Sequence, residues 1–82
     1  MSAMPFIELP LHESEAIATA AYDKVRAILR ITFKSDADRE GGTYDYLEVP
    51  PEVVDELLAA ESHGQFVNWK IKPHYQCRLV VN

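Results

Sequence analysis

The stretch VRAILRITF, residues 25–33, decides the fold of this chain. Apolar and polar residues alternate along it, and a period of two is the pattern of a half-buried β-strand. We therefore predict a strand over residues 25–34. One face should carry the apolar residues toward a core: Val25, Ala27, Leu29, Ile31 and Phe33. The other face should carry Arg26, Ile28 and Arg30 toward water or a partner.

Strands are also expected on both sides of this segment. Residues 16–22 indicate a first strand, and their alanine content leaves a helix as an open alternative. The polar residues 35–42 predict a hairpin loop. Residues 43–49 are rich in β-branched and aromatic types, which favour a third strand. Tyr44 and Tyr46 should share one face of it, because they are two residues apart.

Two helices and a last strand complete the pattern. Pro50 and Pro51 suit the start of the main helix. Ser62 and Gln65 have the spacing of a capping box, which predicts a second, short helix. This short helix should stop before Pro73. Residues 75–81 indicate the last strand. The fold class is therefore α+β: an antiparallel meander of three to four strands, a main helix, a short helix and a C-terminal strand. The expected core comprises Ile17, Leu29, Ile31, Phe33, Val53, Leu57, Leu58, Phe66, Ile71 and Leu79.

Length and charge limit the class of protein. Eighty-two residues suffice for one domain, which we place at 14–82, after residues 1–13 that form either a tail or a short edge strand between prolines. The net charge of −5 argues against sequence-independent binding to a polyanion. The charges are segregated, however: residues 24–34 and 62–82 contain no acid, whereas residues 36–61 contain nine acids and one arginine. Opposite faces of unlike charge are therefore expected.

The remaining sequence features concern location. Cys77 is the only cysteine, so no internal disulfide can form, and a reducing compartment is favoured. The N-terminal residues lack the features of a signal peptide, and no apolar run approaches membrane-spanning length. We therefore expect a soluble cytoplasmic protein without a membrane partner.

No motif predicts catalysis, since the chain has no nucleophile elbow, phosphate loop or paired-carboxylate pattern. His74 and Cys77 are three residues apart, on opposite faces of a strand, which suits neither a metal chelate nor a nucleophile–base pair. A bend at Pro73 is the one alternative. His63 is interpreted as a structural residue at a helix junction. We expect no catalytic residue, no metal site and no cofactor.

Short motifs in a fixed order run through residues 14–76. They are Ser14…Ile17, Tyr22-Asp23, Leu29-x-Ile31-x-Phe33, Gly42-x-Tyr44-x-Tyr46, Val49-Pro50, Leu57-Leu58-x-Ala60, Ser62-x-Gly64, Phe66-x-Asn68, Ile71 and Tyr75. This order resembles the KTSC domain, a small module found at the C-terminus of some lysyl-tRNA synthetases and as a stand-alone bacterial protein. Two turns depart from the family pattern: Ala21 replaces a glycine, and the loop 35–42 is longer. The resemblance implies association with RNA or a tRNA complex.

The first functional hypothesis is a non-enzymatic module that binds RNA. Its candidate residues are Arg26, Arg30, Tyr44, Tyr46, Trp69, Lys70 and Lys72. Single strands are bound by exposed aromatic rings interleaved with cations. The hypothesis therefore needs Tyr44 and Tyr46 on the face that bears the two arginines. If that face meets the helix instead, both rings belong to the core, and Trp69 has the same alternative.

The second hypothesis is a protein-interaction or inhibitor module of the phage type, in which an acidic surface mimics nucleic acid. Glu52 and Asp55 on the main helix are its candidate contacts, although acids near a helix N-terminus commonly compensate the helix dipole. Ile28 is a candidate apolar anchor on the strand. Asn68 either bonds to the backbone or presents its amide to a partner.

Overall fold

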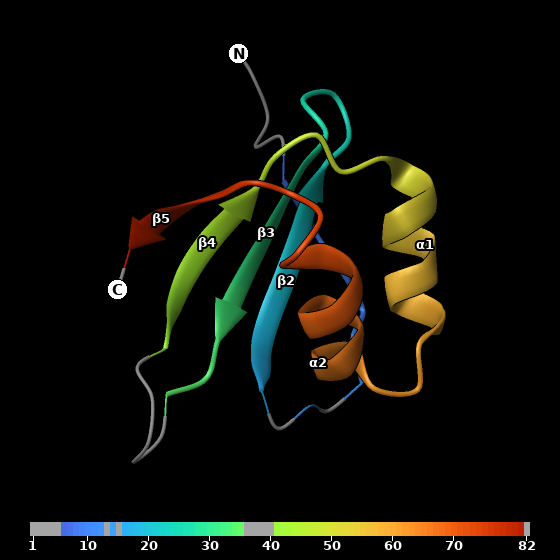
Figure 1. The fold of residues 1–82 in the computed structure, drawn as a ribbon, viewed down its shortest axis with the longest axis vertical. Coiled ribbons are helices and arrows are strands. Elements are labelled where there is room, and N and C mark those ends of the chain that lie inside the picture. The colour runs from blue at the N-terminus through green and yellow to red at the C-terminus, as the bar shows by residue number, and fades with distance from the viewer. Residues whose placement is uncertain (1–5, 13, 15, 36–40, 82) are drawn as a thin grey trace.

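The computed structural model describes residues 6–12, 14, 16–35 and 41–81. Five antiparallel strands form one sheet in chain order, and the helices pack on one of its faces (Figure 1). The strands are β1 (Ile7–Glu8), β2 (Ile17–Asp23), β3 (Ile28–Phe33), β4 (Gly42–Tyr46) and β5 (Cys77–Val81). The helices are α1 (Pro51–Ala59), α2 (His63–Phe66) and η1 (Val67–Ile71), a π-helical turn that continues α2. The predicted α+β meander with two helices and a C-terminal strand is confirmed, and β1 adds a fifth strand at one edge.

The register of the strands assigns the side chains to two faces. Leu29 lies between Tyr22 and Tyr46 on the neighbouring strands, and Ile31 lies between Ala20 and Tyr44. This face meets the helices, and the core consists of Ile17, Ala20, Tyr22, Leu29, Ile31, Tyr46, Val49, Val54, Leu57, Val67 and Ile71. Of the other predicted core residues, four are partly buried against this cluster: Phe33, Val53, Leu58 and Phe66.

Small residues determine how closely α2 approaches β2. A Cβ atom built at Gly64 would lie only 3.2 Å from the Cβ of Ala16. A larger residue at either position would push the helix away from the strand, because interiors are packed closely. Residues 17–23 form β2, so the helix that their alanine content left open is not formed. Ser62 accepts a hydrogen bond from the Gln65 backbone N–H at 3.3 Å, so the predicted N-cap of α2 is present.

The predicted strand over 25–34 begins too early. Asp23 accepts hydrogen bonds from the backbone N–H groups of Val25 and Arg26, at 3.0 and 3.2 Å, and so closes a turn over residues 24–27. Ala27 has a left-handed φ of 60°. Val25 is exposed in this turn, so its assignment to the core face was wrong. Ile28 was predicted to be exposed, but only 7% of it is exposed.

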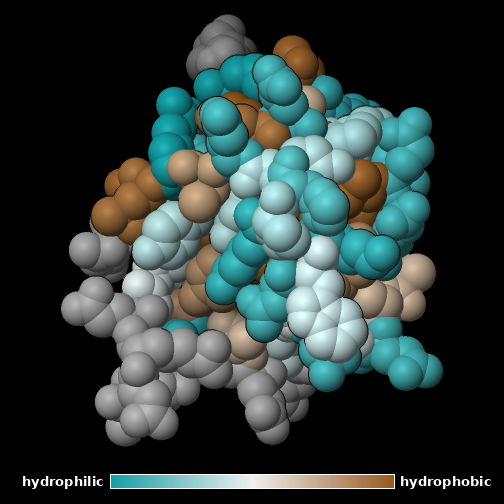
Figure 2. All heavy atoms as spheres, in the orientation of Figure 1, coloured by the Kyte–Doolittle hydropathy of each residue, from teal (hydrophilic) through white to brown (hydrophobic). Residues whose placement is uncertain are grey.

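Leu79 was also assigned wrongly, because 51% of it is exposed. It faces the helix side of the sheet opposite Tyr44, but the helices lie over the β2 side and leave β5 uncovered (Figure 1). Figure 2 accordingly shows hydrophobic atoms at the surface where Figure 1 places β5. None of the described helices is long and apolar enough to cross a membrane.

Candidate functional site

A row of charged side chains crosses the sheet face turned away from the helices. The register aligns Arg30, Asp45 and Arg78 on adjacent strands. Arg30 donates to both carboxylate oxygens of Asp45, from Nε at 2.7 Å and from Nη2 at 3.0 Å. Arg78 Nη2 lies 3.8 Å from the same carboxylate. Only 1% of Asp45 is exposed, so this buried charge depends on the paired guanidinium for its stability.

Arg26 and Asp23 form a second charge pair on this face. Arg26 Nε donates to Asp23 Oδ2 at 2.6 Å, and this hydrogen bond holds the pKa of the Asp23 carboxyl below its ordinary value. The hydrogen bond to Asp45 likewise raises the pKa of Arg30. The Phe6 ring covers both arginines, with its centre 4.1 Å from Cζ of Arg30 and 5.8 Å from Cζ of Arg26. Both cations are therefore already engaged within the protein.

The two tyrosines lie on the opposite face of the sheet. Only 2% of Tyr46 is exposed, and this burial raises its pKa to about 12. Tyr44 is half-buried and meets the Phe33 ring edge-on, with the ring centres 5.9 Å apart. The RNA hypothesis needed Tyr44 and Tyr46 on the face that bears Arg26 and Arg30, and this condition is not met. The face that carries both rings packs against the helices, which was the stated alternative.

A different group of aromatic and basic side chains lies on the helix side. We call it the aromatic–basic surface, and it comprises Phe33, Tyr44, Trp69, Lys70 and Lys72. Lys72 Nζ lies 4.9 Å from the centre of the Phe33 ring, which in turn contacts Tyr44. Trp69 and Lys70 lie in η1, three and two residues before Lys72 along the chain, and both are exposed. Trp69 therefore does not cover the core.

Phe33 is the member of this surface that the sequence did not indicate as a binding residue. Strand alternation assigned it to the core, and it does lie on the core side. It is also the last residue of β3, however, where burial is incomplete. Phe33 lies next to a predicted loop and two residues past the fully buried Ile31. This position at the end of the strand is the feature that could have indicated its partial exposure.

The acidic candidates are displayed on another part of the molecule. Glu52 and Asp55 are exposed on α1, and Glu56 beside them is exposed as well. Figure 1 places α1 at the side of the molecule away from β5. The structure therefore separates the acidic helix from the exposed strand. It does not bring Ile28 or Arg26 together with these acids, because Ile28 is buried and Arg26 pairs with Asp23.

One hollow lies where the residues before β2 meet the start of α2. It has a volume of about 380 Å³, and its lining includes His12, Ser14, Ser62, His63 and Asn68. The buried His63 ring donates from Nδ1 to the Leu57 carbonyl at 2.9 Å and stacks on His12 with the ring centres 3.9 Å apart. The Nε2 atom of His63 has no hydrogen-bond partner in the described part of the chain. His63 thus joins α1 to α2, as its structural interpretation requires.

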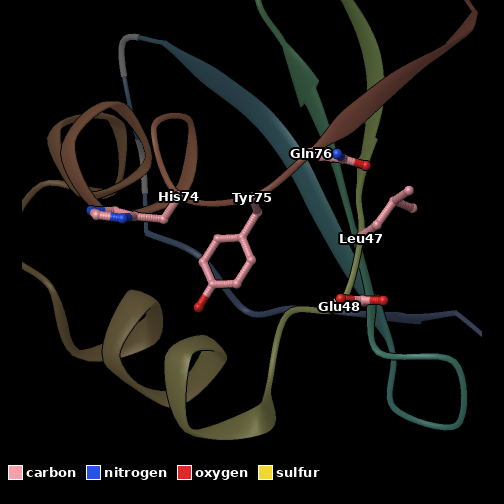
Figure 3. Close-up of a pocket in the computed structure, with 5 residues that line it drawn as sticks. All are labelled: Leu47, Glu48, His74, Tyr75 and Gln76. Atoms are coloured by element: carbon pink, nitrogen blue, oxygen red, sulfur yellow. The ribbon is translucent and has the colours of Figure 1, made fainter.

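A second hollow, of about 460 Å³, lies between the ends of β4 and η1. Leu47, Glu48, His74, Tyr75 and Gln76 line it. Figure 3 shows that the side chains of His74 and Tyr75 point in different directions and do not converge with Glu48. Among the described residues, no group of three or more His, Cys, Asp or Glu side chains is placed to hold a metal ion. The hollow therefore presents separate polar groups rather than an acid–base arrangement.

These observations define a small α+β domain with neutralised charge pairs on one sheet face and an aromatic–basic surface on the other. The chain belongs to the KTSC domain family, whose model matches residues 13–75. The crystal structure of a KTSC domain protein from Yersinia pestis is similar, with a TM-score of 0.78, 33% identity and coverage of 92% of this chain and 97% of that chain.

Two relatives support the same assignment. A protein of Tsukamurella paurometabola is 52% identical over 64 residues, which cover 78% of this chain and 88% of the relative. An uncharacterized protein of Stutzerimonas stutzeri is 40% identical over 65 residues, which cover 78% of this chain and 84% of the relative. The resemblance inferred from the ordered motifs is thus confirmed, and it leaves the binding partner to be argued from the surface.

Proposed function

We propose that this protein is a non-enzymatic binding module that contacts single-stranded RNA through its aromatic–basic surface. The observation that carries the proposal is the exposure of Trp69, 67% of which is in contact with solvent. Indole rings are rarely left in water without a role, because they are large and apolar. An exposed indole offers a flat face on which an RNA base stacks.

The neighbours of Trp69 suit the same ligand. Lys70 follows it directly, and Lys72 lies over Phe33 beside Tyr44. Ammonium groups that alternate with aromatic rings bind phosphates while the rings stack bases. Residues 62–82 contain no acid that would oppose this contact. The net charge of −5 therefore does not represent the local charge of the surface.

The proposal omits some residues that the sequence suggested. Arg26 and Arg30 each pair with a buried aspartate and contact Phe6, so phosphate binding would have to break these contacts. Tyr46 is buried in the core. The RNA surface is therefore smaller than the sequence indicated, and it lies on the other side of the sheet.

The test uses fluorescently labelled oligouridylate and follows its anisotropy at low salt, where phosphate contacts are strongest. Lys70→Glu should weaken binding about tenfold or more and reduce the salt dependence, because one phosphate contact is replaced by repulsion. Trp69→Ala should also weaken binding, since loss of a stacked ring costs about 1–3 kcal/mol per base. Trp69 is the only tryptophan, so quenching of its fluorescence gives an independent measure of binding in the wild type.

Lys24→Glu is the matched control, because Lys24 is an exposed lysine in the β2–β3 turn. It changes the net charge by the same amount as Lys70→Glu and should retain most of the affinity. Absence of binding at low salt would reject the RNA proposal. Equal losses in the two variants would show attraction to overall charge without a defined surface.

A second candidate function is an acidic protein-interaction or inhibitor module. The exposure of Glu52, Asp55 and Glu56 along α1 favours it. Such a surface attracts a basic partner and orients it more than it adds affinity. Poly-lysine is a suitable probe. Its binding should be lost in the Glu52→Lys, Asp55→Lys double variant, and RNA binding should not be weakened there if the first proposal holds.

A further inference from the structure

The hollow between the residues before β2 and the start of α2 contains a buried polar atom without a partner. Only 1% of His63 is exposed, and its ring lines this hollow. Nδ1 donates to the Leu57 carbonyl at 2.9 Å, whereas Nε2 has no hydrogen-bond partner among the described residues. Such atoms are rare in folded proteins, because burial removes their bonds to water. Nε2 of His63 therefore marks a place where a ligand atom is expected.

The partner of Nδ1 determines what Nε2 can bind. A carbonyl oxygen only accepts, so the ring hydrogen lies on Nδ1, and Nε2 of the neutral ring has a lone pair. A ligand must therefore bring an N–H or O–H group to it. The His12 ring stacks on His63 with the ring centres 3.9 Å apart. Because His12 is exposed, its ring can rotate to uncover Nε2 and can stack on a planar ligand.

Two serine hydroxyl groups in the same hollow are placed to donate. Ser62 accepts from the Gln65 N–H at 3.3 Å, and Ser14 accepts from two backbone N–H groups at 3.2 Å each. Each hydroxyl keeps its own hydrogen as a donor. Ser62 directly precedes His63, and Ser14 Oγ lies 3.8 Å from the point that a Cβ atom at Gly64 would occupy. The two donors thus lie beside the residues before and after the acceptor.

The charge and size of the hollow narrow the class of ligand. Its described lining includes the carboxylate of Glu61 but no lysine or arginine, so a phosphate or carboxylate group would be disfavoured. Its volume is about 380 Å³, whereas one water molecule needs about 30 Å³. The lining therefore suits an uncharged group, larger than water, that carries a donor with an acceptor on each side.

We infer that this hollow binds the imide edge of a uracil ring. Uracil carries its N3–H donor between two carbonyl acceptors, so the N–H meets Nε2 of His63 and the carbonyls meet the serine hydroxyls. Cytosine has a lone pair at N3 and adenine has one at N1, and either would face the lone pair of Nε2. Guanine has an N–H here but a second donor where uracil has a carbonyl. Each of these bases leaves a buried group unpaired and binds more weakly.

Selection of uracil within RNA rests on the proposed function and adds a base preference to it. Asn68 also lines the hollow, and it directly precedes Trp69 in η1. The hollow and the aromatic–basic surface therefore adjoin along the chain at these two residues. A strand whose bases stack on the exposed indole has a neighbouring nucleotide to place in the hollow.

Free nucleosides test the hollow without any phosphate contact. The nitrogen resonances of the histidine rings of the ¹⁵N-labelled wild type should first show the hydrogen of His63 on Nδ1. Uridine at millimolar concentration should then shift the Nε2 resonance. The analogue 3-methyluridine has a methyl group in place of the N3 hydrogen, so it should bind about tenfold more weakly or worse. Equal titration by the two nucleosides overturns the inference, as does a hydrogen found on Nε2.

His63→Asn tests the same atom from the side of the protein. Asparagine can place an amide N–H close to the position of Nδ1, but it has no atom at the position of Nε2. The variant should lose the preference for uridine over 3-methyluridine. His74→Asn is the matched control, since His74 is an exposed histidine that lines the other hollow, and it should keep the preference. If His63→Asn does not fold, the comparison of nucleosides on the wild type still decides.

Oligonucleotides separate this inference from the proposed function. Labelled oligouridylate should bind the wild type about tenfold more tightly than oligocytidylate of the same length, because both have the same phosphates. Equal affinity for the two would overturn uracil selection and leave RNA binding intact. If neither bound but free uridine still exceeded 3-methyluridine, the uracil site would be supported and the RNA function rejected.

Discussion

Asp23 shows how one side chain can set both a turn and a charge pair. Its Oδ1 atom accepts from the backbone N–H groups of Val25 and Arg26, and its Oδ2 atom accepts from the Arg26 guanidinium. These donors act on the ionised carboxylate, and the hydrogen bond from the Arg26 side chain contributes most to the lowered pKa. The alternating pattern in this region carries no direct sign that the aspartate would end it.

The lowered pKa of Asp23 makes stability depend on pH in a defined direction. The folded state keeps this carboxylate ionised below its ordinary pKa of 3.8, whereas the unfolded state binds a proton there. The contribution of Asp23 is therefore present above that pKa and is lost as the pH falls through the lower folded value. Urea unfolding at pH 7 and pH 3 should show a smaller acid-induced loss for Asp23→Asn than for the wild type.

Asp55→Asn is the control for this experiment, because Asp55 is exposed on α1. This variant should keep the acid-induced loss of the wild type. If Asp23→Asn kept it too, the acid sensitivity would have to arise from other carboxylates.

At the scale of elements, the β2–β3 turn contains a residue in an unfavourable conformation. Ala27 has φ of 60°, and its carbonyl accepts from the Val49 N–H at 2.8 Å, so the turn is tied to the start of α1. A left-handed conformation costs an L-residue about 1–2 kcal/mol, and glycine avoids most of that cost. We predict that Ala27→Gly raises the free energy of unfolding by about 0.5–1 kcal/mol, as measured by urea denaturation.

The comparison variant places the same substitution in a helix. Ala59→Gly at the end of α1 should lower stability, because glycine loses more backbone freedom there and relieves no strain. Destabilisation by both variants would show that the Ala27 methyl group stabilises the turn by packing more than its conformation costs.

The elements also show which parts of the fold and of the site the sequence could predict. Alternation and turn residues are local, so the strands, both helices and the cap at Ser62 followed from them. The face of the sheet that the helices cover depends on long-range packing, which no local pattern encodes. For this reason Tyr44 and Tyr46 could be placed together but not on a given face. Trp69, Lys70 and Lys72 were candidates from the sequence for the proposed surface, whereas Phe33 was assigned to the core.

At the scale of the whole molecule, the core joins the sheet to both helices. Leu57 of α1 is fully buried, and its carbonyl accepts from Nδ1 of His63. Leu57→Ala should lower the free energy of unfolding by about 2–5 kcal/mol, because it leaves a cavity in the closely packed interior. Since small domains have total stabilities of about 5–15 kcal/mol, circular dichroism should show a clearly lower urea midpoint.

Leu79→Ala is the matched substitution outside the core. Because 51% of Leu79 is exposed, a change within about 0.5 kcal/mol is expected. Similar losses for the two leucines would contradict the division of the helix-side face into a covered and an uncovered part.

The meander has a consequence for the order in which the protein forms on the ribosome. The first four strands pair with their neighbours along the chain, and such local contacts form quickly. β5 reaches β4 only after both helices have been synthesised. Until then, β4 is the exposed border of the nascent sheet, and the residues of β5 cover it only once they have emerged.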